Sequence, residues 1–159
     1  MDNLISKKAK ESHLNNEIYI HDLDHYVLGD HNCLSIPFDK LLANGFNTRQ
    51  TDVRPANSVN TAFQLVAVIF QLQSLQQFGG VSATHLDWTM VPYVRKSFYK
   101  HYKDGLKYLD GYEESAPFDD SLSIEDEEYK YNAKAYRYAM DMTIKEVYQA
   151  VEGMYHNLS

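Results

Sequence analysis

Side chains able to bind metal or move protons gather in the segment IYIHDLDHY, residues 18–26, and in the tripeptide HNC, residues 31–33. Imidazole and carboxylate groups together suit several divalent metals. Aspartate and histidine after an extended run also satisfy turn backbone groups through side-chain hydrogen bonds. The spacing matches no compact metal motif, so the polar-turn interpretation is favoured and we predict no metal site. The five side chains concerned are His21, Asp22, Asp24, His25 and His31.

The only cysteine of the sequence, Cys33, stands beside Leu34 and close to Ile36. A lone cysteine among apolar residues is typically a small buried hydrophobe. The functional interpretation is a thiol at the end of a strand, where it donates hydrogen to a bound substrate. One cysteine also excludes an intrachain disulfide and a cysteine-rich zinc site.

A third candidate site comprises residues at the two ends of one predicted helix. Asn57 and Ser58 are capping residues at its start, and free backbone N–H groups at a helix start can hold phosphate. Gly79 and Gly80 follow its far end, where glycine lets the backbone approach a ligand closely. A glycine pair serves equally well as a helix stop, so both interpretations stay open.

The elements that position these residues are predicted to be mostly helical. The clearest is a helix over residues 59–77, whose apolar side chains wrap more than one face and favour burial in a core or against another subunit. Extended runs are expected at residues 17–20 and 33–36, the second ended by Pro37. Further helices are expected up to residue 14, at 38–44 before Gly45, from 82 or 84 through Pro92 to 109, and after a cap at Ser123 and Asp126.

Length and composition narrow the function classes. A chain of 159 residues with 44% hydrophobic content fits one domain or a piece of a larger fold. A formal charge of −7 disfavours general nucleic-acid binding. The longest apolar run, residues 62–70, is far shorter than the roughly 20 residues of a membrane span, and the N-terminus does not resemble a secretory signal. We therefore expect a cytoplasmic protein.

Three segments in this order, IYIHDLDHY, HNCLSI and RPANSVNTAFQLVAVIFQLQSLQQFGGVS, resemble the early catalytic segment of the anaerobic (class III) ribonucleoside-triphosphate reductases. The resemblance extends from about residue 5 to residue 158. It implies a glycyl radical enzyme with a ten-stranded α/β barrel, which reduces ribonucleoside triphosphates to deoxyribonucleotides. Residues 1–159 would form the first part of that barrel. The predicted fold class is thus α/β, with this piece predominantly α-helical and carrying one or two short strands.

The resemblance also implies roles for individual residues. Cys33 matches the family cysteine that faces the substrate ribose and donates hydrogen to its 2′ position. His21 would manage the proton of the leaving hydroxyl group, and Asn32 would position the substrate. The helix that follows Ser58 would pair with its two-fold mate in a homodimer, with a deoxynucleotide effector bound beside it. The expected effector contacts are Asn57, Ser58, Gln77, Gly79 and Gly80.

The departures from the family pattern indicate a fragment. The sequence has no second cysteine to carry a thiyl radical, no glycyl-radical loop, no four-cysteine zinc site and no ATP-binding cone, so the chain is not expected to turn over substrate alone. No cofactor is expected in this piece. The parent family uses a glycyl radical, a structural zinc, allosteric nucleotides and a radical-SAM activating enzyme. Two alternatives stay open, a non-catalytic nucleotide-binding or dimerisation module and an unrelated metal-binding helical protein built on His21 and His31.

Overall fold

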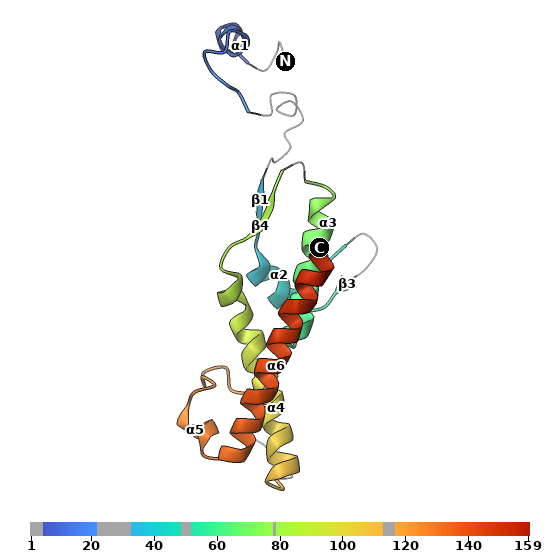
Figure 1. Cartoon of the computed structure of the whole chain (residues 1–159), viewed down its shortest axis with the longest axis vertical. Coiled ribbons are helices and arrows are strands. Elements are labelled where there is room, and N and C mark those ends of the chain that lie inside the picture. The colour runs from blue at the N-terminus through green and yellow to red at the C-terminus, as the bar shows by residue number, and fades with distance from the viewer. Residues whose placement is uncertain (1–4, 22–32, 49–51, 78, 113–116) are drawn as a thin grey trace.

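A computed structural model of the chain describes residues 5–21, 33–48, 52–77, 79–112 and 117–159. Within these ranges there are six helices and four short strands, and three long helices lie side by side in an elongated body (Figure 1). In chain order the elements are α1 (Lys7–Leu14), β1 (Leu34–Ile36), α2 (Phe38–Asn44), β2 (Phe46–Asn47), β3 (Asp52–Val53), α3 (Val59–Ser74), β4 (Val81–Ala83), α4 (Leu86–Leu109), α5 (Glu127–Lys130) and α6 (Ala133–Leu158).

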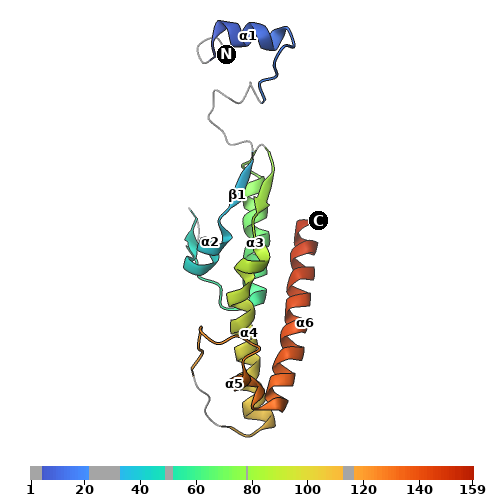
Figure 2. The ribbon, with the colours of Figure 1, turned by 90° about the vertical axis from the view of Figure 1, so that its left-hand side faces the viewer.

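The core of the body lies between α3, α4 and α6 (Figure 2). The inner face of α3 is fully buried at Val59, Ala62 and Val66, which recur at helical spacing. A second cluster lies further along α4 and α6, where the ring of Phe98 packs edge-on against the ring of Tyr129 with centroids 5.2 Å apart. Apolar burial therefore holds α6 against α3 and the first part of α4 in one cluster, and against the rest of α4 in the other.

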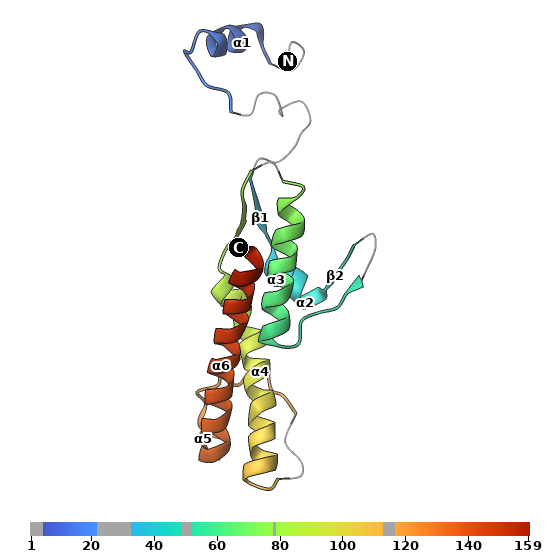
Figure 3. The same ribbon diagram turned by 45° about the vertical axis from the view of Figure 1, so that its right-hand side comes forward.

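The strands form two separate pairs. β1 and β4 are parallel, with Leu34 opposite Val81 and Ile36 opposite Ala83. β2 and β3 form an antiparallel hairpin beside α2 and α3 (Figure 3). Gly45 precedes the hairpin at φ 71°, and a Cβ atom there would lie 2.3 Å from the carbonyl oxygen of Val53. Only glycine fits this turn, so the predicted helix stop at residue 45 is confirmed.

The predicted strand at residues 17–20 is wrong. These residues have no strand in the structure, and Tyr19 is largely exposed. The N–H group of Ile20 donates instead to Nδ1 of His13, 3.2 Å away. A strand needs a partner to satisfy its backbone, and a side chain of the preceding helix region has taken that place here.

Two predicted helix boundaries are also wrong. The helix expected to start at Ser82 or Thr84 begins later, because residues 81–83 form strand β4 and α4 begins at Leu86 after His85, whose φ is 52°. α4 then continues through Pro92. The predicted cap of the last helix at Ser123 and Asp126 is wrong. The N–H of Ser123 donates to Oδ2 of Asp126 at 2.6 Å, but this bond closes a turn before the four-residue α5. The last helix, α6, begins at Ala133.

The structure therefore confirms a predominantly helical piece with few, short strands. None of the helices in the described ranges combines the length and the apolar character that a membrane crossing requires.

Candidate functional site

Cys33 lies directly before β1, at the end of the parallel strand pair. It is exposed, so its interpretation as a buried hydrophobe is wrong. The N–H of Leu34 donates to the carbonyl oxygen of Gly80 at 3.0 Å, and Oγ of Ser82 donates to the carbonyl oxygen of Leu34 at 3.4 Å. A Cβ atom on Gly80 would lie 4.0 Å from Sγ of Cys33. Strand pairing thus brings the candidate thiol and the candidate glycine pair together.

A hollow of about 740 Å³ opens beside this strand end. It lies between the end of α3, the glycines and the end of α6, and Gln71 of α3 donates to the carbonyl oxygen of Asn157 across it. Its lining residues are Phe70, Gln71, Ser74, Gly79, Gly80, Val81, Asn157, Leu158 and Ser159. Gly80, the neighbour of Cys33 across the strand pair, lines this hollow, whereas Cys33 itself does not.

His21 belongs to the segment that follows α1. Its ring lies near the ring of Tyr19, with centroids 6.1 Å apart, and Tyr19 lies near His13 in turn. Asn32, the predicted substrate contact, lies outside the described residues. Of the polar cluster considered for metal, His21 is described while Asp22, Asp24, His25 and His31 are not. Across the described part of the chain, no three side chains of metal-binding type come together.

The start of α3 has most of its amide groups already bonded. The N–H of Val59 donates to Oγ of Ser97 on α4 at 3.0 Å. The N–H of Thr61 donates to Oγ of Ser58 at 3.3 Å, and the N–H of Ala62 donates to the carbonyl oxygen of Ser58 at 3.0 Å. Ser58 is thus the predicted N-cap. A phosphate at this end would meet few free amide groups, which weakens the anion-site interpretation.

Glu146 of α6 ties the same helix start to the other two long helices. Its Oε1 accepts from Nδ2 of Asn60 at 3.2 Å and from Oγ of Ser97 at 3.3 Å. Its Oε2 lies 2.7 Å from Nε2 of His101, and both side chains are largely buried. One carboxylate therefore joins α3, α4 and α6. The sequence analysis missed this network because Glu146 lies 45 to 86 positions from its three partners and no local pattern connects them.

The five predicted effector contacts form two groups in one chain. Asn57 is exposed and Ser58 half-buried at the start of the 16-residue α3. Gln77, whose Oε1 accepts from Gln73 at 3.5 Å, lies with Gly79 and Gly80 beyond its other end. At 1.5 Å per residue, α3 separates the groups by about 24 Å. The structure brings Gly80 to Cys33, but it does not bring the five residues to one place.

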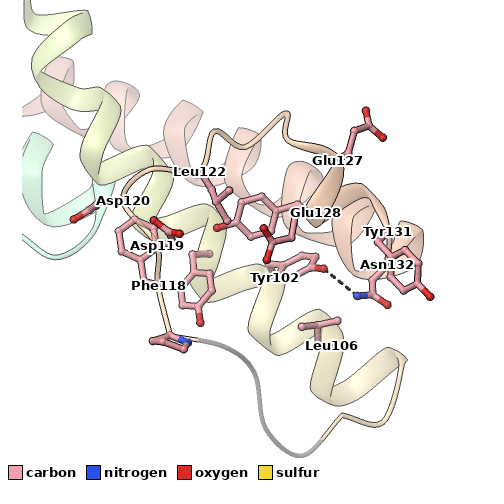
Figure 4. Close-up of a pocket in the computed structure, with 13 residues that line it drawn as sticks. Tyr102, Leu106, Phe118, Asp119, Asp120, Leu122, Glu127, Glu128, Tyr131 and Asn132 are labelled. Carbon is pink, nitrogen blue, oxygen red and sulfur yellow. Dashed lines mark hydrogen bonds between the residues drawn. The ribbon is translucent and has the colours of Figure 1, made fainter.

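A second hollow, of about 820 Å³, lies between α4, α5 and the segment before α5 (Figure 4). Nδ2 of Asn132 donates to the hydroxyl oxygen of Tyr102 at 3.1 Å along its wall. Burial raises the pKa of Tyr102 and of Tyr129. Hydrogen bonds from the side chain and backbone of Ser121 lower the pKa of Asp119. None of the predicted site residues lines this hollow.

Comparison with known proteins places the chain in one family. The family model described as anaerobic ribonucleoside-triphosphate reductase matches residues 1–159. Proteins with this same name are similar to the chain, and all are much longer. The *Haemophilus influenzae* protein is 28% identical over 107 residues, covering 67% of this chain and 15% of its own length. The phage T4 protein is 26% identical over 151 residues, which cover 94% of this chain and 21% of the phage protein. The Escherichia coli K12 protein is 25% identical over 157 residues, which cover 98% of this chain and 19% of the E. coli protein.

The chain thus spans about a fifth or less of the length of these relatives. The match over every residue removes the interpretation as an unrelated metal-binding protein. The chain belongs to the anaerobic ribonucleoside-triphosphate reductase family.

Proposed function

We propose that this chain supplies the first part of the catalytic region of an anaerobic ribonucleoside-triphosphate reductase, with Cys33 as the thiol that faces the substrate ribose. The observation that carries the proposal is the exposed sulfur directly before β1, fixed by a parallel strand pair beside Gly80, a residue that lines an open hollow. Two paired strands are too few for a closed sheet, which fits a piece of a larger α/β barrel.

In the proposed reaction the hydroxyl group leaves the ribose radical as water, and Cys33 then gives a hydrogen atom to the 2′ carbon. The S–H bond breaks, a C–H bond forms and the unpaired electron passes to sulfur, to be reduced by the electron donor of the parent enzyme. An S–H bond suits this step because it exchanges hydrogen readily with carbon radicals, provided that the thiol is oriented at the ribose in a water-poor pocket. His21 holds the proton that the leaving hydroxyl needs, since the two ring nitrogens of an imidazole can accept and donate protons. Asn32 positions the ribonucleoside triphosphate.

The proposed effector site is completed by a second copy of the chain. If two α3 helices pair antiparallel about a two-fold axis, the start of one comes beside the end of the other. Asn57 and Ser58 of one copy then approach Gln77, Gly79 and Gly80 of its mate, which removes the 24 Å separation within one chain. A deoxynucleotide bound there also touches Gly80, the residue paired next to Cys33, and so reaches the substrate side of the strands.

The remaining parts of the proposed enzyme lie outside these 159 residues. A single cysteine cannot provide a four-cysteine zinc site or a second reactive thiol. The glycyl radical of the family would start the radical chemistry when present. We propose that the zinc site, the radical-bearing loop and the contact with a radical-SAM activating enzyme belong to the rest of the parent protein.

A chimera tests the role of Cys33. The matching segment of the *E. coli* relative is replaced by residues 1–159, and deoxyribonucleotide formation is measured without oxygen. We expect the chimera to be active and its Cys33→Ser variant to lose activity by at least about 1,000-fold, since an alcohol O–H bond is too strong to replace the thiol. An active Cys33→Ser chimera would contradict the proposed role.

The second candidate function is a non-catalytic nucleotide-binding or dimerisation module. It is favoured by the apolar side chains that α3 leaves exposed, Val68 and Leu72. Calorimetric titration of deoxynucleoside triphosphates into the chain alone, combined with the activity of the chimera, distinguishes the two candidate functions. Nucleotide binding with an inactive chimera supports the module, whereas an active chimera supports the enzyme segment.

A further inference from the structure

Asn44 and Gly45 form the junction between helix α2 and the β2–β3 hairpin, and they are the only Asn-Gly pair of the sequence. Asn44 is the last residue of α2 and is exposed. Gly45 follows at φ 71° and ψ −178°, which turns the chain out of the helix and into the hairpin. The side-chain amide of an asparagine can react with the backbone nitrogen of the next residue, so this junction is a candidate site of chemical modification.

The backbone nitrogen of Gly45 is not held by a hydrogen bond. Each of the other five helices in the described ranges is followed by a residue whose N–H donates back into the last turn, as that of Leu75 does to the carbonyl oxygen of Gln71 at 3.3 Å. Among the described residues, no group accepts from the N–H of Gly45. The nitrogen that would react with Asn44 therefore breaks no hydrogen bond of the fold when it does so.

The fold also requires glycine at residue 45. A Cβ atom there would lie 2.3 Å from the carbonyl oxygen of Val53 and 3.1 Å from the nitrogen of Pro55. A side chain on the residue after an asparagine slows ring closure, because it hinders the approach of the backbone nitrogen to the side-chain amide. The close approach of the hairpin to Gly45 thus keeps the least hindered neighbour next to Asn44.

We propose that Asn44 is a site of spontaneous deamidation, through a cyclic imide formed with the backbone nitrogen of Gly45. The nitrogen attacks Cγ of Asn44 and a C–N bond forms. The side-chain amino group leaves as ammonia, taking the proton that the attacking nitrogen gives up. Water then opens the ring at either carbonyl carbon, and no atom is oxidised or reduced. One opening leaves aspartate at position 44, and the other leaves isoaspartate, in which the main chain runs through the side-chain carbon.

The modification is a property of this chain alone. It goes beyond the proposed function and does not depend on ribonucleotide chemistry. It needs only two adjacent residues and water, so it requires neither a second copy nor the rest of a longer protein. Asparagine is among the residues that limit the lifetime of proteins at high temperature, which is the general form of the same chemistry.

Isoaspartate should disturb the junction that Asn44 occupies. It adds a methylene group to the main chain directly before Gly45, which already lies against Val53. Both products also place a negative charge at the C-terminal end of α2, where the helix dipole disfavours it. Phe38 and Leu42 of α2 are buried in the core beside α3, so a displaced α2 would disturb the packing of the helical body (Figure 3).

Peptide mapping by mass spectrometry tests the reaction during incubation of the pure chain at mildly alkaline pH. The measurement follows conversion of each side-chain amide into a carboxyl group. Asn47 is the internal comparison, because it is also exposed but precedes Thr48. We expect Asn44 to be converted at least about tenfold faster than Asn47. A parallel incubation in urea should change the rate at Asn44 by less than about tenfold, since no hydrogen bond of the fold protects Gly45.

Asn44→Gln is the matched control variant. It keeps an amide at residue 44, but its longer side chain would have to close a larger and less favourable ring, so no carboxyl group should appear there. An isoaspartate-specific carboxyl methyltransferase detects the second product. Asp110, which precedes Gly111, can form isoaspartate by losing water instead of ammonia, so the product must be located in the peptide that contains residue 44.

Thermal unfolding tests the effect of the modification on the fold. After equal incubation, the Tm of the original chain should fall by at least about 2 °C, while that of Asn44→Gln should stay constant. Freshly prepared Asn44→Asp carries the new charge without the added methylene group. Its Tm should therefore lie between those of the fresh and the incubated original chain.

Conversion of Asn44 no faster than that of Asn47 would overturn the proposal. Protection of Asn44 in the folded chain, with rapid reaction in urea, would also overturn it, because the fold would then shield the junction. An equal fall in Tm for the original chain and for Asn44→Gln would reject the effect on α2, since another reaction would then cause the loss.

Discussion

Sγ of Cys33 and the backbone of Gly80 are neighbours across the parallel strand pair, with 4.0 Å between the sulfur and the place where a Cβ atom of residue 80 would stand. The hydrogen bond from Leu34 to Gly80 fixes this approach, because it is the first bond of the β1–β4 ladder. The absence of a side chain at residue 80 leaves one flank of the thiol open. Any movement of the glycine pair therefore changes the space beside the sulfur.

Gly80→Val should close that flank. We expect the reaction of Cys33 with a bulky aromatic disulfide reagent to slow by about tenfold, which corresponds to about 1.4 kcal/mol of steric cost in the approach to sulfur. The rate of thiolate release measures it directly, since the chain has one cysteine. Gly80→Ala is the control, because a methyl group at 4.0 Å makes only ordinary contact. Equal slowing by both variants would show that backbone change, rather than bulk, is responsible.

Signals that act over a few residues predicted much of the fold. Ser58 caps α3, Gly45 ends α2 at positive φ, and Asn16 takes φ 59° at the predicted break after α1. In each case one residue either caps a helix or turns the backbone at its own position, so the local sequence is enough to predict the feature. The predominantly helical character follows from the same kind of signal.

Contacts between distant residues could not be predicted in this way. β4 has three residues and pairs with β1 across 47 positions, so neither its length nor its periodicity distinguishes it from a helix start. For the same reason, the hydrogen bonds between Glu146 and its partners could not be predicted from the sequence. By contrast, the predicted helix over residues 59–77 already placed the five effector candidates at its two ends. Local pattern identified the candidates, whereas their grouping depends on the tertiary fold.

Glu146 should be the most sensitive polar residue of the helical body. Glu146→Ala removes the acceptor shared by Asn60, Ser97 and His101, and we expect the free energy of unfolding to fall by about 2–3 kcal/mol because buried donors lose their partner. Urea unfolding monitored by circular dichroism measures the change. Glu152→Ala, on the exposed side of α6, should change it by less than about 0.5 kcal/mol. Similar losses in both variants would remove the special role given to Glu146.

Two glycines of the long helices should respond oppositely to alanine. A Cβ atom on Gly105 would lie 2.9 Å from Cα of Ala135, where α4 and α6 touch, so Gly105→Ala should destabilise the fold by about 1–3 kcal/mol. A Cβ atom on Gly153 meets nothing within 4 Å, so Gly153→Ala should stabilise α6 by about 0.5–1 kcal/mol. Thermal unfolding of the two variants measures whether each substitution lowers or raises the stability of the fold. A neutral Gly105→Ala would mean that the helices separate at little cost.

Buried tyrosines should make the fold sensitive to alkali. Burial raises the pKa of Tyr93, Tyr102 and Tyr129 above the ordinary value of 10.0. Below pH 10 their contribution to stability is fully present. As the pH rises past 10 the unfolded chain releases these protons first, so the free energy of unfolding falls until the folded-state pKa is passed. Urea unfolding at a series of alkaline pH values should show this decline.

Tyr129→Phe tests which residues cause the decline. The variant keeps the ring that packs against Phe98 and Tyr102, with centroids 5.2 and 5.0 Å away, but removes the hydroxyl group that titrates. We expect the stability of the variant to fall less steeply above pH 10, because one proton fewer is released on unfolding. Tyr131→Phe removes a largely exposed phenol and should leave the slope unchanged. If both variants kept the original slope, Tyr129 would not contribute, and the alkaline loss would have to come from other groups such as Tyr93 and Tyr102.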